Sequence, residues 1–201
     1  CSDHIICGTG LYDNNNIHKI VKENISAYHV YTSCGEFYDI LNTCNAVLLY
    51  SPLVAVRDPT YTETELMATR AEVSAIRDLC YFYLIRTFRD VPYSTQPFLD
   101  ELQQMAMPAT KFDAVLDSLI TDLENVKSYA VKTYPVSKTN YQCGRITQDA
   151  IHAMLAEMYL WKKDYANSVK YADMVIDAKT QRFQDEIDNA GGNSSSYKMF
   201  E

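Results

Sequence analysis

Apolar residues recur at the spacing of helix faces along most of the chain. Between residues 112 and 126 they return every three to four positions, and charged residues fill the gaps between them. This periodicity places the apolar side chains on one face of an α-helix. The segment is therefore predicted to be an amphipathic helix, and its apolar face comprises Phe112, Val115, Leu116, Leu119, Ile120, Leu123 and Val126.

Two more segments predict helices by the same pattern. Residues 31–50 are expected to form a helix that ends before Ser51–Pro52, because the residue before a proline is pushed out of the helical region. Residues 63–88 predict a longer helix whose last turns are apolar nearly all round, as in a helix packed between other helices. The apolar face of the first of these comprises Phe37, Ile40, Leu41, Cys44, Val47 and Leu48.

The stretch YFYLIRTFRDVPY, residues 81–93, concentrates aromatic side chains. It can be interpreted as the lining of an active site or as the end of a buried helix. Helical spacing puts Tyr81, Leu84, Ile85 and Phe88 on one face, and apolar stripes at this spacing are usually packing surfaces. The buried helix is therefore the favoured interpretation, and the proline at position 92 ends it.

Residues 147–176 match the spacing of the tetratricopeptide repeat, a pair of antiparallel helices. The matching positions are Leu155, Ala156, Tyr159, Asp164, Tyr165 and Ser168, whereas Lys163 stands where glycine is usual and His152 where tryptophan is usual. We predict a helical hairpin from Ile146–Lys162 and Tyr165–Ala178, with Asp164 as the N-cap of the second helix. Ala156 is expected to let the helices approach, and Tyr159 to pack against small side chains of the second helix.

The fold class predicted from these patterns is all-α, built from antiparallel, tetratricopeptide-like helical hairpins. At least four helices should exceed three turns, and any β structure should be limited to a minor hairpin. No run of about 18 apolar residues occurs, and the first residues lack the charged and apolar regions of a signal peptide. The sequence therefore predicts neither a membrane-spanning helix nor an unprocessed precursor.

Composition narrows the class of partner. The net charge is -8 and the isoelectric point is near 5.0, so the chain has no broad basic surface for nucleic-acid phosphates or anionic lipids. Nucleic acid is thus not an expected partner. Tyrosine is unusually frequent, with 16 residues against 7 Phe and one Trp. Because tyrosine joins an apolar ring to a polar tip, this usage suits partly wet surfaces that bind sugars or proteins.

The cysteines and histidines do not show metal-binding spacing. No CxxC or HxxxH pattern occurs, so neither a metal site nor a cofactor is expected. Cys34 and Cys44 fall on one predicted helix about 15 Å apart, too far for a disulfide. The six cysteines are expected to be mostly buried free thiols.

No set of residues predicts catalysis. His152 and Glu157 share a helix, but without a partnered nucleophile a packed histidine is favoured over a general base. The acidic, amide-rich stretch at residues 13–16 lacks the glycine and distal glutamate of a calcium loop. If any segment contacts a ligand, we expect it to be the polar, amide-rich segment that precedes the helix predicted at residues 31–50. The alternative is that this segment is a plain surface loop. The candidate ligand-binding residues are Asp3, His4, Tyr12, Asn14, Asn15 and Tyr31.

Four motifs in order resemble the SusD/RagB family. RDLCYFYLIRTFRDVPY is similar to the signature helix that ends in Gly-Asp-Val-Pro-Tyr, with Arg89 in place of the glycine. GRITQDAIHAMLAEMYLWKKDYANSVKYADMVI resembles the family's Gly-Arg-Ala-Thr helix pair, and FDAVLDSLITDLENV its Ile-x-x-Asp-Leu helix. YTSCGEFYDILNTCNAVL resembles the Trp-x-x-x-Tyr-x-x-Ile-x-x-x-Asn helix, with Tyr31 in place of the tryptophan.

The resemblance implies a SusD-like α-α superhelix in a lipoprotein on the surface of a Gram-negative outer membrane. Such a protein captures glycans, or sometimes peptides, and passes them to a TonB-dependent, SusC-type barrel transporter. It is a binding protein and not an enzyme. The alternative function is a tetratricopeptide-like scaffold that binds only protein.

Family members are much longer, so the chain is expected to be the N-terminal, helical part of one. Residues 1–201 would then form a single helical domain, with an irregular segment at 1–30, the scaffold at 31–178 and a loop-rich tail at 179–201. The segment alone is expected to bind oligosaccharide weakly or not at all. Cys1 can be the lipidated residue of a mature lipoprotein or an internal residue; the internal interpretation is favoured, with the membrane anchor upstream.

Overall fold

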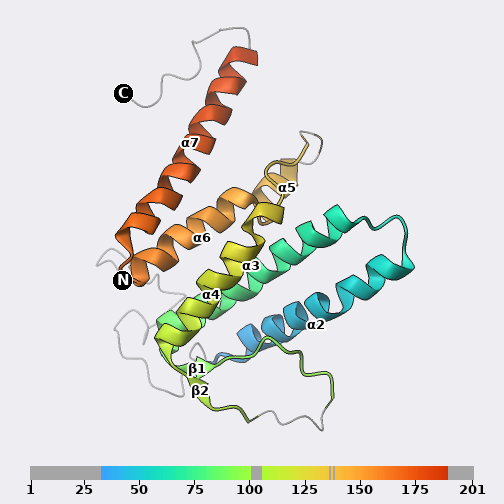
Figure 1. Cartoon of the computed structure of the whole chain (residues 1–201), viewed down its shortest axis with the longest axis vertical. Helices are drawn as coiled ribbons and strands as arrows, with labels where there is room; N and C mark the ends of the chain where they lie inside the picture. The colour runs from blue at the N-terminus through green and yellow to red at the C-terminus, as the bar shows by residue number, and fades with distance from the viewer. Residues whose placement is uncertain (1–32, 101–105, 136, 138, 190–201) are drawn as a thin grey trace, which may run out of the picture. The chain divides into compact units, whose positions relative to one another are not determined.

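The computed structural model describes residues 33–100, 106–135, 137 and 139–189. The chain divides into two compact units, Cys1–Asp39 and Ile40–Glu201, and only residues 33–39 of the first are described. Figure 1 shows that the described residues are mainly helical. The elements are α2 (Gly35–Arg57), α3 (Glu63–Phe88), β1 (Val91–Pro92), β2 (Ala109–Thr110), α4 (Phe112–Val126), the 3₁₀ turn η3 (Lys127–Tyr129), α5 (Thr139–Gly144), α6 (Gln148–Trp161) and α7 (Tyr165–Asn189).

The predicted all-α class is confirmed. Five of the described helices exceed three turns, and the strand structure among the described residues is one antiparallel pair, β1 with β2. Helices α3 and α4 begin and end at the predicted residues. The pattern located α4 because that helix buries one continuous apolar face, and α3 because its last turns are apolar nearly all round.

The sequence predicts that the helix at residues 31–50 ends before Ser51–Pro52, but α2 continues to Arg57. A proline inside a helix lacks the N–H that would bond to the carbonyl four residues earlier, here that of Leu48. The Arg70 guanidinium donates to the Leu48 carbonyl oxygen across a distance of 3.4 Å. A side chain from α3 therefore supplies the donor that proline removes. The helix also starts later than expected, at Gly35, so Cys34 lies just before it.

By length and composition, α2 is the helix among the described residues that could span a membrane. That match is weak, because core helices of other proteins pass the same test. The polar side chains of α2 instead form hydrogen bonds with other segments of the chain. The Asn42 side chain donates to the Phe98 carbonyl and accepts from the Phe98 N–H, at 3.1 and 2.7 Å.

Helix α3 forms the centre of the packing and contacts both α4 and α6. Tyr81, Phe82, Leu84 and Ile85 are each 1% exposed, so the interpretation of the aromatic stretch as a buried helix end is confirmed. Phe88 was expected on the same buried face, but it is 40% exposed. Cys34, Cys44 and Cys80, the cysteines whose side chains the structure describes, are free thiols, and the last two are buried.

Helices α6 and α7 form the predicted antiparallel hairpin (Figure 1). Asp164 caps α7, since its carboxylate accepts from the Asn167 N–H at 3.2 Å. The Ser168 hydroxyl donates to the Ala156 carbonyl at 2.9 Å, which places the two backbones close together at these small residues. Tyr159 packs against α7 as expected, and it does so through Tyr171, with 5.8 Å between the ring centroids; its packing on small side chains stays a prediction.

Helix α7 extends to Asn189, beyond the expected end at Ala178. The expected loop-rich tail is therefore wrong for residues 179–189. Two contacts with α6 hold this extension, because Lys179 and Arg182 both form ion pairs with the buried Asp149.

Replacing Ala156 with leucine is expected to lower the free energy of unfolding by about 1–3 kcal/mol, because the larger side chain overpacks the contact between α6 and α7. Urea unfolding measures the change. Ala153→Leu, at an exposed position of the same helix, is the matched control and should change stability little. Equal effects of the two substitutions would contradict the close approach at Ala156.

Lys163 has φ of 65°, the left-handed region that costs little only for glycine. Lys163→Gly is expected to raise the free energy of unfolding by about 1 kcal/mol, because it removes this strain. Ala166→Gly, in the first turn of α7, should instead destabilise, since glycine there costs conformational entropy. Thermal unfolding of both variants tests the prediction, and shifts of the same sign would refute it.

Candidate functional site: a polar pocket around Arg77

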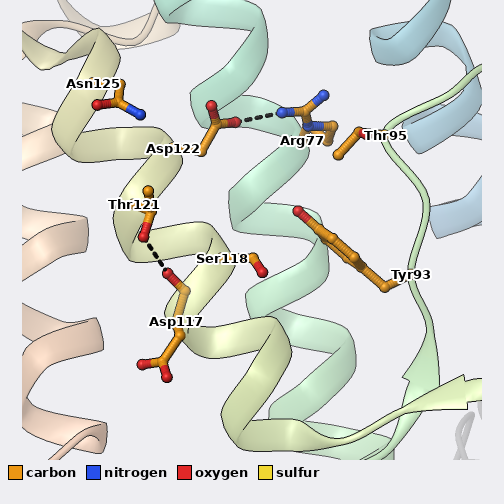
Figure 2. A pocket seen from close by; sticks show the side chains of 8 residues that line it. All are labelled: Arg77, Tyr93, Thr95, Asp117, Ser118, Thr121, Asp122 and Asn125. Atoms are coloured by element: carbon orange, nitrogen blue, oxygen red, sulfur yellow. Dashed lines mark hydrogen bonds and ion pairs between the residues drawn. The ribbon is translucent and has the colours of Figure 1, made fainter.

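A polar cavity lies between α3, α4 and the segment that follows β1 (Figure 2). Helix α4 contributes the largest share of its lining, because short polar residues recur beside the apolar face that packs into the core. The cavity volume is about 380 Å³. Its lining residues are Arg77, Tyr93, Thr95, Asp117, Ser118, Thr121, Asp122 and Asn125.

Arg77 is the buried centre of the site, with 7% of its side chain exposed. One terminal nitrogen of its guanidinium donates to the Asp122 carboxylate, as Figure 2 shows. The other donates to the Asn45 side-chain oxygen at 3.1 Å, and Nε lies 3.6 Å from an Asp78 oxygen. Arg77 thus ties α2, α3 and α4 together.

A second cavity, of about 270 Å³, adjoins the same arginine. Arg77, Asp122 and Thr95 line both cavities, so the ion pair forms part of a wall that the two share. On the α2 side, Leu48 and Leu49 contribute apolar side chains to the lining of the second cavity.

Asp78 lies beside the pocket and is 0% exposed. Burial raises the pKa of its carboxyl well above the usual value, and the Asp122 charge adds to this, although Arg77 opposes it. Neither carboxyl oxygen of Asp78 has a hydrogen-bond partner. The uncharged acid is therefore favoured at this position.

The wall formed by residues 93–96 is fixed by hydrogen bonds to its backbone. The Tyr81 hydroxyl donates to the Ser94 carbonyl and accepts from the Ser94 N–H, both at 2.9 Å. The Asn45 amide donates to the carbonyls of Ser94 and Gln96 at 3.1 and 3.3 Å. Tyr93 packs on Tyr81 with ring centroids 4.8 Å apart. This support makes the pocket wall rigid before any ligand arrives.

Tyr93 presents a neutral phenol to the pocket. Burial raises the pKa of its hydroxyl to about 12, and the charge of Asp78 would act in the same direction. At neutral pH the group therefore remains a hydrogen-bond donor and acceptor.

The ligand-binding residues predicted from the sequence, Asp3, His4, Tyr12, Asn14, Asn15 and Tyr31, lie outside the described residues. Their role stays a prediction. His152 is buried, 7% exposed, with its ring 5.6 Å from that of Tyr171, which agrees with a packed histidine. Glu157 forms an ion pair with Arg86.

Sequence reasoning missed the pocket residues. The available signal was a pair of charges, Arg77 and Asp78, inside a helix whose neighbouring positions are apolar. Charged side chains are rarely buried unless they are paired. Among the described residues, no group of three or more His, Cys, Asp or Glu side chains is placed to hold a metal ion.

No protein-family model matches the chain. Two SusD-like proteins of Formosa agariphila are similar to it in sequence. One is 24% identical over 139 residues, which is 69% of this chain and 25% of the relative. The other is 32% identical over 66 residues, 32% of this chain and 12% of the relative.

Solved structures show the same fold. A laminarin-binding SusD-like protein superposes with a TM-score of 0.72 and 24% identity, over 86% of this chain and 35% of that one. The chain is thus similar to SusD-like proteins in sequence and in fold. A surface glycan-binding protein A from Bacteroides uniformis gives a TM-score of 0.67 and 23% identity, over 81% and 35% of the two chains. The chain spans about a quarter of the length of the first SusD-like relative it matches.

Proposed function

We propose that this SusD-like chain is the helical part of a cell-surface protein that binds glycans. The observation that carries the proposal is the fold likeness to two proteins described as laminarin-binding and surface glycan-binding. Each likeness covers more than four fifths of this chain, at TM-scores of 0.72 and 0.67. The shallow, open pocket around Arg77 supports it, because hydrogen bonds already hold its wall at residues 93–96 and little further ordering is needed on binding.

The proposed activity is capture and not cleavage. Glycoside hydrolases use two carboxyl groups, one as acid and one as nucleophile or base. The pocket has two carboxyl groups in its lining, and each already forms an ion pair with a basic side chain: Asp117 with Lys162 and Asp122 with Arg77. This pairing favours a binding role for them, and no cofactor is needed for that role.

The partner proposed for the bound state is a TonB-dependent, SusC-type barrel transporter. The location proposed is the outer-membrane surface, with a lipid anchor upstream of this chain or at Cys1. Both proposals rest on the SusD-like fold and its implied family, and a peptide remains the alternative ligand. Co-purification of a barrel protein with the chain from its native membrane tests them.

A tetratricopeptide-like scaffold that binds only protein is the second candidate. The hairpin of α6 and α7 favours it, because α7 leaves large apolar residues exposed at helical spacing. Tyr165, Val169, Ile176 and Phe183 are 61, 58, 60 and 47% exposed. Glycan binding separates the two candidates.

Calorimetry with a panel of oligosaccharides tests the proposed function, on this chain and on the full polypeptide that its gene encodes. Binding without release of shorter sugars is expected for the full polypeptide, with weaker binding by the 201-residue chain. Chromatography of the incubated sugars detects cleavage. Release of shorter sugars would overturn the proposal of a binder, and a complete lack of binding by the full polypeptide would favour the protein scaffold.

A further inference from the structure

The pocket around Arg77 offers mostly hydrogen-bond acceptors. The Ser118 hydroxyl donates to the Ala114 carbonyl at 2.9 Å, and the Thr121 hydroxyl donates to the Asp117 carbonyl at 2.8 Å (Figure 2). Each hydroxyl proton is thus used inside α4, while the oxygen lone pairs can still accept. The carboxylates of Asp117 and Asp122 are acceptors by nature. A ligand that fits this surface must bring donors.

The charges at the pocket are nevertheless balanced. Lys162 Nζ lies 2.6 Å from an Asp117 oxygen, and Arg77 forms an ion pair with Asp122. The buried Asp78 behind Arg77 favours its uncharged form. A cation therefore finds no net negative charge, and an anion finds no unpaired positive group at these residues.

An acceptor-rich, charge-balanced cavity suits a neutral molecule with many hydroxyl groups. Each sugar hydroxyl can donate to a carboxylate or hydroxyl oxygen of α4, and the Asn125 amide can both donate and accept. The Tyr93 ring adds an apolar wall opposite α4, as Figure 2 shows. The volume of about 380 Å³ falls in the range of small-molecule sites.

We propose that this pocket is a subsite for an uncharged sugar unit and that it excludes uronic and sulfated sugars. The inference rests on the proposed glycan-binding function and adds a place and a charge selectivity to it. An anionic substituent would face the carboxylate oxygens of Asp117 and Asp122. The basic side chains beside them, Lys162 and Arg77, are already used in ion pairs with these carboxylates. Removal of one hydrogen-bond acceptor from α4 should weaken binding of the neutral sugar without unfolding the helix.

Nuclear magnetic resonance on the isotope-labelled 201-residue chain tests the subsite, because it detects binding at millimolar affinity. Neutral and uronic oligosaccharides of equal length are titrated separately. We expect the neutral sugar to shift the backbone amides of residues 93–95 and 117–125, and the uronic sugar to leave them unchanged.

Thr121→Val is the test variant, since it removes the hydroxyl and keeps the shape of the side chain. Binding of the neutral sugar should weaken about 3- to 10-fold, as for the loss of one hydrogen bond. Thr87→Val is the matched control. Thr87 is exposed on α3, and its hydroxyl makes the same bond to a carbonyl four residues earlier, that of Tyr83. This control should bind normally.

Shifts by a neutral sugar at other residues only would overturn the subsite while leaving the proposed function intact. Equal shifts of the pocket amides by the uronic sugar, or by calcium or methylammonium ions, would overturn the charge selectivity. No shift with any sugar would also overturn the subsite, and calorimetry on the full polypeptide then judges the proposed function separately.

Discussion

Replacing Arg77 with leucine is expected to lower the free energy of unfolding by about 3–5 kcal/mol. Removing the buried Arg77 leaves the Asp122 carboxylate, which is 28% exposed, without its paired cation. The Asn45 side chain, 4% exposed, also loses a donor at 3.1 Å. An unsatisfied buried polar group of this kind costs about 1–3 kcal/mol, which is part of the expected loss.

Arg70→Leu is the matched control for that experiment. It makes the same substitution on the same helix, but Arg70 donates only a long bond of 3.4 Å to the Leu48 carbonyl. Its effect should be about 1 kcal/mol or less. The double variant Arg77→Leu, Asp122→Leu should recover part of the stability, because no unpaired carboxylate remains. Equal losses for Arg77→Leu and Arg70→Leu in urea unfolding would show that Arg77 does not organise the packing.

The helices could be predicted because the pattern of burial within each is local. Helix α4 buries six residues of one apolar face, and the same periodicity is visible in the sequence. The proline rule gave the wrong end for α2 at Pro52. The Leu48 carbonyl, which proline leaves without its helical N–H partner, accepts a hydrogen bond from Arg70 on α3, and the local sequence does not show this contact. The capping box of α3 was not predicted, although Thr62 and Glu65 have the required spacing and the structure forms both of its bonds.

The pocket could not be predicted in the same way. Arg77 and Asp122 are 45 residues apart, and their pairing depends on how α3 packs against α4. A sequence shows that a charged residue interrupts an apolar helix but not which residue neutralises it. The positive φ angles at Arg89 and Lys163 had a local signal, because both stand where the related patterns carry glycine. Strain of that kind can be located from the sequence, whereas a paired buried charge cannot.

Asp78→Asn is expected to stabilise the protein at neutral pH and to have little effect near pH 4. In the unfolded chain an aspartate titrates with a pKa of about 3.9. In the folded chain burial raises the pKa of Asp78 well above its usual value. Between these two pKa values the folded chain holds a proton that the unfolded chain has released.

Folding stability therefore falls as pH rises through that window, by up to about 1.4 kcal/mol for each pH unit. Below the unfolded pKa the contribution of Asp78 is fully favourable, and above the folded pKa no further loss occurs. The amide of the variant does not ionise, so this part of the slope should disappear. Urea unfolding at intervals from about pH 4 to pH 8 measures both slopes.

Asp58→Asn provides a control of opposite sign in the same measurement. Hydrogen bonds from the Thr60 side chain and N–H lower the pKa of the Asp58 carboxyl, so its ionised form is favoured in the folded chain. This variant should lose stability by an amount that stays nearly constant between about pH 8 and about pH 4, and that shrinks only when the measurement is extended below about pH 4, because the lowered pKa of Asp58 lies there. Parallel pH profiles for Asp78→Asn and the parent would mean that Asp78 is ionised in the folded state. The charge balance proposed for the pocket would then fail, because a third carboxylate would face Arg77.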